Sequence, residues 1–178
     1  MDLARFSALR VLKTDTPSVF ISYSRDDEEK VQKLHEHLIE AGFNAWLDTK
    51  DLLGGEDWQR VIEEKIESSD LVLVCLSRSS IAKKGYLQKE VKRILEVAEL
   101  QPEGAEFLIP VRLDLCEIPR SMSRFNSVDL FEGNNLAKLE ESIRRAWRKS
   151  RLKQQEAQHA ATNPKGIPGI RTGKISLT

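Results

Sequence analysis

Residues 70–76 read Asp70-Leu71-Val72-Leu73-Val74-Cys75-Leu76, one aspartate followed by six apolar residues without a break. A strand with one solvent-exposed face alternates apolar and polar side chains, whereas an unbroken apolar run is typical of a strand buried on both faces of a parallel sheet. The polar stretch from Ser77 to Ser80 ends the run. Residues 70–76 therefore predict an α/β fold in which helices cover both faces of the sheet.

Strand and helix patterns alternate on both sides of this run. Further strands are predicted at residues 18–23, 43–47, 107–113 and 127–130, and helices carry the apolar stripes from Val31 to Ala41, Trp58 to Ile66, Tyr86 to Leu100 and Leu136 to Trp147. This alternation predicts a flavodoxin-like, doubly wound, five-stranded parallel sheet of order 2-1-3-4-5. Asp26 is the predicted N-cap of the first helix, with Glu29 completing a capping box. Pro110 cannot donate to a ladder, so we expect it near an edge or a bulge.

Changes in composition divide the chain into three parts. Residues 1–16 are an N-terminal extension that ends at Pro17, and residues 17–150 hold all the predicted strands and helices. Residues 151–162 are charged and rich in Gln and Ala, and residues 163–178 carry prolines and glycines with little apolar content. We expect residues 151–178 to form a flexible C-terminal tail or a linker.

The charge balance excludes several kinds of partner. Lys+Arg and Asp+Glu both number 28, so the formal net charge is zero, which argues against nucleic acid or an anionic membrane as the main partner and favours self-association. No apolar stretch approaches the roughly 18 residues that span a bilayer, so a cytoplasmic protein is expected. Two cysteines make no disulfide framework. His35 and His37 are two apart on a helix and face different directions, so no metal site is predicted.

The predicted sheet order locates a functional crevice at the carboxyl ends of strands 1 and 3, where the winding reverses. Glu90 lies about one turn inside the third helix, four residues after Tyr86, so these two side chains share a helix face. The loop that begins at Asp48 leaves the sheet at the same edge as this crevice. The strand ends deliver Tyr23, Ser24, Arg25, Ser77 and Ser79 to it.

The same residues also have ordinary structural interpretations. Glu90 lies in a charge-rich helix, where a solvated glutamate next to Arg93 is the common case. Arg25 beside two aspartates is compatible with a capped, salt-bridged turn, and Ser77 with a residue that approaches a helix. Two other doubly wound families do not fit: a phosphoacceptor receiver domain needs an aspartate where Ser77 stands, and the acidic residues 26–28 would repel a flavodoxin's phosphate.

Five segments, in order and at the right spacing, resemble those of TIR (Toll/interleukin-1 receptor) domains, particularly bacterial ones. The resemblance covers about residues 17–149. The segments are Phe20-Ile21-Ser22-Tyr23-Ser24 with Arg25-Asp26-Asp27, Trp46-Leu47-Asp48 with the loop up to Trp58, residues 69–77 with Tyr86 and Glu90, Ile109-Pro110-Val111, and Val128-Asp129-Leu130-Phe131.

The resemblance implies roles for particular residues. In enzymatic TIR domains a glutamate of the third helix is required to cleave the nicotinamide–ribose bond of NAD, and Glu90 matches it. Tyr86 stands where the family usually has Trp. Arg25 and Asp48 match family positions near the nucleotide. Tyr23 and Ser77 are expected to bind the substrate as well, from their place at the carboxyl ends of strands 1 and 3. The loop of residues 48–57 is expected to contact a neighbouring TIR domain, and the assembly residues are Leu52, Leu53, Gly54, Gly55 and Trp58.

Two functions follow as alternatives. The first is an NAD glycohydrolase that needs no metal or cofactor, takes NAD as substrate, gives nicotinamide with ADP-ribose or a cyclic ADP-ribose, and acts when TIR domains self-associate. The second is a non-catalytic TIR module that signals through protein–protein contacts, since the fold alone does not fix function. Glu90 favours the enzyme, because a pure adaptor needs no carboxylate there. A bacterial-type domain suggests a defence or effector setting.

Overall fold

The computed structural model describes residues 16–47, 58–83, 91–101, 104–133 and 135–162. They form a parallel five-stranded sheet of order β2-β1-β3-β4-β5, which confirms the predicted topology. The strands are β1 (Ser18–Ser22), β2 (Asn44–Leu47), β3 (Leu71–Leu76), β4 (Leu108–Arg112) and β5 (Val128–Asp129). The helices are α2 (Glu28–Glu40), α3 (Trp58–Ser68), α4 (Arg78–Ala82), α6 (Lys92–Glu99) and α7 (Asn135–Thr162), with short 3-10 turns η1 (Arg25–Asp27) and η3 (Arg120–Met122).

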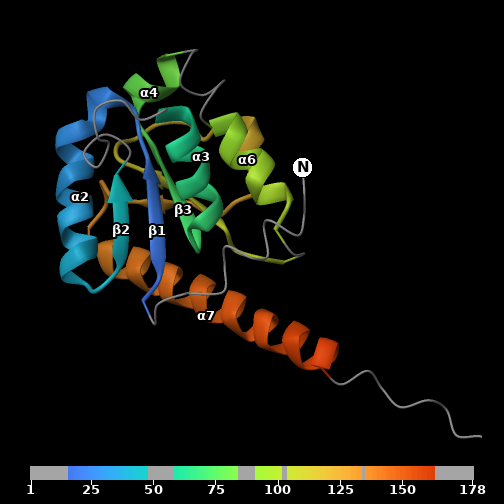
Figure 1. Cartoon of the computed structure of the whole chain (residues 1–178). Coiled ribbons are helices and arrows are strands. Elements are labelled where there is room, and N and C mark those ends of the chain that lie inside the picture. Colours follow the sequence, from blue (N-terminus) through green and yellow to red (C-terminus); the bar gives the residue numbers. More distant parts are fainter. Residues whose placement is uncertain (1–15, 48–57, 84–90, 102–103, 134, 163–178) are drawn as a thin grey trace, which may run out of the picture.

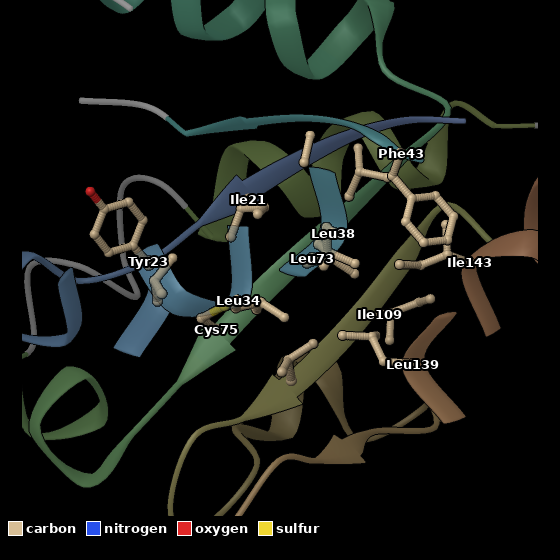
Figure 2. Close-up of a cluster of buried hydrophobic side chains, with 14 of the residues drawn as sticks. Ile21, Tyr23, Leu34, Leu38, Phe43, Leu73, Cys75, Ile109, Leu139 and Ile143 are labelled. Atoms are coloured by element: carbon tan, nitrogen blue, oxygen red, sulfur yellow. The ribbon is translucent and has the colours of Figure 1, made fainter. Parts of the chain in front are cut away.

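Strand β3 lies at the centre of the sheet and is buried along its whole length, as its unbroken apolar run predicts. Its odd-numbered side chains, such as Leu73, pack in a core with residues of α2 and α7. Its even-numbered side chains, such as Val74, pack in a second core with residues of α3 and α6. Figure 1 shows the helices on the two faces, and Figure 2 shows the first core, where Leu73 lies beside Leu38 and Ile143 lies further along the same core. Both faces of the sheet are therefore covered.

Pro110 lies in β4 in register with Val74 of β3. The backbone groups of Phe107 and Leu113 bond to β3, and the carbonyl of Arg112 accepts from Leu130 on the other side. The backbone N–H and C=O groups of odd-numbered residues in β4 therefore point toward β3. Those of even-numbered residues point toward β5, and so does the backbone nitrogen of Pro110. Among the described residues β5 pairs with β4 only from Val111 onward, so Pro110 lies where β4 has an edge without a paired strand, as predicted.

The C-terminal boundary differs from the expectation. Helix α7 does not end near Ser150 but continues to Thr162, so residues 151–162 are helical rather than a flexible tail. Arg, Leu, Lys, Gln and Glu fill residues 151–156, and all of them favour a helix, while the first proline comes at position 164. Figure 1 shows α7 extending well beyond the sheet. Residues 1–15 and 163–178 lie outside the described residues.

The start of α2 also differs. Asp26 was expected to cap this helix with Glu29, but the N-cap residue is Asp27, and neither aspartate makes a side-chain capping bond. Glu29 bonds instead to Lys33, one helical turn further on. The capping-box prediction is wrong because both aspartate side chains are turned toward the chain that follows β3. At the other end, α2 is followed by Gly42 with φ of 85°, as expected where a helix closes in the left-handed region.

Candidate functional site at the carboxyl ends of β1 and β3

The carboxyl ends of β1 and β3 lie side by side, because the two strands pair in parallel from Val19↔Leu71 to Ser22↔Val74. Chain leaving β1 passes through Tyr23 and Ser24 into the turn η1, and chain leaving β3 passes through Ser77 into α4. This is the rim that the sheet order predicts for a crevice. We call the residues from Tyr23 to Asp27 and from Ser77 to Lys83 the rim.

A buried hydrogen bond joins the two halves of the rim. The hydroxyl of Ser77 donates to Oδ2 of Asp27 at 2.7 Å, and Asp27 is only 5% exposed. The same hydroxyl accepts from the backbone N–H of Ser80 at 3.0 Å, while the hydroxyl of Ser80 accepts from the N–H of Ser77 at 2.8 Å. Ser77 therefore caps α4 and ties its first turn to η1.

A second, exposed set of contacts lies beside the first. Oδ2 of Asp26 accepts from the hydroxyl of Ser79 at 2.5 Å and lies 2.6 Å from Nζ of Lys83. The ammonium of Lys83 is the main reason that the pKa of Asp26 is below its ordinary value, and the hydroxyl of Ser79 adds to the effect. Two consecutive aspartates of η1 thus bind both ends of α4.

The other side of α4 is fixed to the chain that follows β4. The backbone N–H of Arg78 donates to Oδ1 of Asp114 at 3.0 Å, and Nε of Arg78 donates to the carbonyl of Leu115 at 2.7 Å. Lys30 of α2 lies 3.8 Å from the second carboxylate oxygen of Asp114. Helix α4 is only five residues long, so these bonds rather than its own hydrogen bonds hold it in place.

Below the rim, the thiol of Cys75 is fully buried in the core that α2 and α7 cover. This burial, with the nearby carboxylate of Asp27 as a smaller cause, raises the pKa of the Cys75 thiol far above its ordinary value. A thiol that stays protonated is a poor nucleophile, so Cys75 acts as an apolar core residue.

The structure places three of the predicted nucleotide-contacting residues. Arg25 is exposed in η1, as a ligand-binding residue would need to be. Tyr23 is 4% exposed and belongs to the core, with its hydroxyl directed away from the other labelled side chains in Figure 2. Ser77 is 1% exposed, and its hydroxyl is used by Asp27 and Ser80. In this arrangement Tyr23 and Ser77 build the rim rather than line its surface.

The remaining predicted site residues lie outside the described part of the chain. They are Glu90, Tyr86 and Asp48, together with Leu52, Leu53, Gly54 and Gly55 of the assembly loop. Trp58 begins α3, but its side chain is not described. Val91, the residue directly after Glu90, is described and is 1% exposed within the second core. The roles assigned to these residues stay predictions.

Sequence reasoning missed the buried carboxylate of Asp27 and the part played by Lys83. The signal lay in two spacings: adjacent aspartates directly after one strand, and serines two apart directly after the neighbouring strand. Because the carboxyl ends of neighbouring parallel strands lie side by side, these spacings are compatible with two hydrogen bonds from the serine hydroxyls to the aspartate carboxylates. The helix-capping pattern at Asp26 and Glu29 offered a local explanation of the same residues and obscured the long-range one.

Replacing Ser77 by alanine is expected to destabilise the fold by about 2–3 kcal/mol, because it removes both a helix cap and the donor to a buried carboxylate. Urea unfolding followed by circular dichroism measures the loss. Ser79→Ala is the matched control, since it removes a hydroxyl–carboxylate bond that is exposed, and it should cost less than about 1 kcal/mol. Equal losses in the two variants would contradict the structural role given to Ser77.

Comparison with known proteins agrees with this fold. Structures that the chain is similar to include the TIR domain of the Toll-related receptor TRR-2 from Hydra magnipapillata, with a TM-score of 0.59 and 22% identity over 72% of this chain and 99% of that one. A metazoan TIR-STING receptor from C. gigas, solved with 2',3'-cGAMP, has a TM-score of 0.58 and 22% identity over 75% of this chain and 41% of that chain. Such low identities support the fold alone.

A curated relative is the uncharacterized protein y4lF of Sinorhizobium fredii, 30% identical over 105 residues, which are 57% of this chain. The match covers 31% of y4lF, so this chain spans about a third of the length of that relative. Among the described helices, none is both long and apolar enough to cross a membrane. The family model of the TIR domain matches residues 19–146, from the first residues of β1 into α7. The chain therefore belongs to the TIR domain family.

Proposed function

We propose that this TIR domain is a cytoplasmic NAD glycohydrolase that cleaves the nicotinamide–ribose bond when several copies associate. The observation that carries the proposal is the arrangement of residues at the rim. The sheet order brings the ends of β1 and β3 together, Arg25 is exposed on one of them, and buried and exposed bonds fix α4 against it. Glu90 follows Lys83 by seven residues in the sequence.

The chemistry needs few groups. Nicotinamide leaves as a neutral molecule from a cationic substrate, so little help from a general acid is required. The ribosyl carbon becomes oxocarbenium-like, and a carboxylate close to the ribose stabilises that charge, binds the ribose hydroxyls or attacks the carbon. Glu90 is the carboxylate that we assign to this step, and Arg25 is suited to the diphosphate of NAD.

Association of copies is the proposed trigger. The loop of residues 48–57 is assigned to the contact with a neighbouring domain, and the net charge of zero leaves no long-range repulsion between copies. An assembly that completes the site would make activity depend on protein concentration more steeply than in direct proportion. This dependence separates a site completed by association from one that is complete in each copy.

The test is to incubate the purified chain with NAD over a wide range of protein concentrations and to quantify nicotinamide by chromatography. We expect release per molecule to rise with concentration and to rise further when tagged copies are clustered on a multivalent support. Identification of the second product separates ADP-ribose from a cyclic form. No release under forced clustering would contradict the enzyme and leave the non-catalytic TIR module, in which the same surfaces only bind partners.

A further inference from the structure

A pocket lies at the amino ends of β4 and β5, at the end of the sheet opposite the rim. Its walls include Leu108 and Ile109 of β4, residues 126–128 at the start of β5, and Lys138 and Arg145 of α7. Its volume is about 590 Å³, which is within the range of sites that hold small molecules. Because the sheet is parallel, this pocket and the rim are on opposite sides of the domain.

The wall formed by β4 presents backbone groups that lack a strand partner. The carbonyl of Phe107 accepts from β3 and that of Arg112 accepts from Leu130, so even-numbered residues direct their backbone groups toward β5. In the described part of the chain, β5 is paired only from Val111 onward. Leu108, which is 4% exposed, therefore directs its N–H and C=O into the pocket, and no described residue bonds to either. Buried backbone groups nearly always have a hydrogen-bond partner, so this pair indicates a bound molecule that offers one acceptor and one donor.

The wall formed by α7 carries positive charge. Lys138 and Arg145 are seven residues apart and share a face of the helix with Ser142. Glu106, the acidic residue among those lining the pocket, lies 3.2 Å from Arg145 and 3.0 Å from Lys149. Partial burial acts to raise the pKa of Glu106, but these two cations outweigh it and hold the pKa below its ordinary value. The one carboxylate is thus shared by two cations.

Lys138 supplies further positive charge. It forms no ion pair within the described ranges, although Asp129 lies close enough to feel its charge. The pKa of Asp129 is lowered mainly by its hydrogen bonds to Arg112, and Lys138 acts only as a weaker, more distant charge. The α7 wall therefore has positive charge to spare for an anion.

From this arrangement we infer that the pocket binds a small organic anion at a site separate from the rim. The phosphate or carboxylate of the ligand lies against Lys138 and Arg145, and an amide-like group pairs with the backbone N–H and C=O of Leu108. Asn126 and Ser127 also line the pocket and offer side-chain donors and acceptors. The inference does not depend on the proposed NAD cleavage, because binding is measured without any reaction.

The experiment titrates two probes into the full chain and follows proton–nitrogen correlation spectra. AMP combines a phosphate with the donor–acceptor edge of adenine, and N-acetylglutamate combines carboxylates with an amide. We expect at least one probe to bind with a Kd below about 1 mM and to shift the amide signal of Leu108. Inorganic phosphate, which lacks the donor–acceptor group, should bind at least about tenfold more weakly. The tighter of the two probes distinguishes a phosphate ligand from a carboxylate ligand.

Charge variants test the α7 wall. Lys138→Met and Arg145→Met should each weaken binding of the tighter probe about tenfold, because each removes a charge-assisted hydrogen bond. Arg148→Met is the matched control, since Arg148 is on the same helix but pairs with Glu141 and does not line the pocket. Its Kd should stay within about twofold. Melting temperatures of all three variants should change by no more than about 2 °C, because the side chains are exposed.

The possible results separate this site from the rim. If neither probe shifts the Leu108 signal, or if Arg148→Met weakens binding as much as the two pocket variants, the site is overturned. Equal binding of inorganic phosphate would overturn the pairing with Leu108. A shift from AMP that is confined to Arg25 and its neighbours would assign that ligand to the rim, which contradicts the pocket and leaves the proposed NAD cleavage intact.

Discussion

Glu90→Gln is expected to lower nicotinamide release by at least about a hundredfold, which corresponds to about 2.7 kcal/mol of transition-state stabilisation. Glutamine keeps the size of the side chain and its ability to accept hydrogen bonds, but it removes the negative charge. Because the ribosyl carbon gains positive charge as nicotinamide departs, the lost interaction is strongest in the transition state. The loss should therefore appear in kcat, with KM changed little.

A glutamate of helix α6, which follows Glu90 in the sequence, provides the control. Glu96 of α6 is half-exposed and lies 3.4 Å from Arg93 and 4.0 Å from Lys92, as an ordinary surface glutamate does. Glu96→Gln should retain release within about twofold, since exposed ion pairs contribute little. Release that survives Glu90→Gln would show that a different carboxylate acts. Asp27 could not replace Glu90 without a rearrangement of the rim, because its carboxylate is buried and bonded to Ser77.

The fold could be predicted from sequence because its signals are strong and local. An unbroken apolar run can be buried only where both faces of a strand are covered, and β3 has a core on each side. Alternation of strands and helices then restricts the order of the sheet, since crossovers are right-handed. The end of α7 was missed for the opposite reason: charged, polar helix formers resemble a linker in composition, and only their propensity distinguishes them.

The meeting of the ends of β1 and β3 could be predicted from sequence, but the contacts made there could not. The switch-point rule identified the ends of β1 and β3, and Arg25 is exposed there. Burial, however, depends on tertiary packing. Ser77 and Tyr23 were assigned to a ligand because their position is right, whereas one is enclosed by Asp27 and Ser80 and the other packs in the core. Which of two adjacent aspartates is buried also depends on the turn η1, which a helix-capping pattern concealed.

Leu73→Ala is expected to destabilise the protein by about 3–5 kcal/mol, a large fraction of the roughly 5–15 kcal/mol that holds a typical domain together. Leu73 is fully buried and pairs with Ile21 on one side and Ile109 on the other. Helices α2 and α7 close this core over the sheet, as Figure 2 shows for Leu38 and Ile143. A cavity there cannot collapse easily, because two strands and two helices would have to move together.

Urea unfolding with an unchanged m-value would measure the loss in the free energy of unfolding, and the melting temperature should fall by roughly 10 °C. Leu152→Ala is the control, since Leu152 on α7 is 60% exposed and its truncation should change stability by less than about 0.5 kcal/mol. A loss below about 1 kcal/mol for Leu73→Ala would mean that the core relaxes around the deleted atoms. Because Leu73 lies in the core and is not part of the rim, the folded fraction of this variant should keep its kcat, so activity should fall only as the protein unfolds.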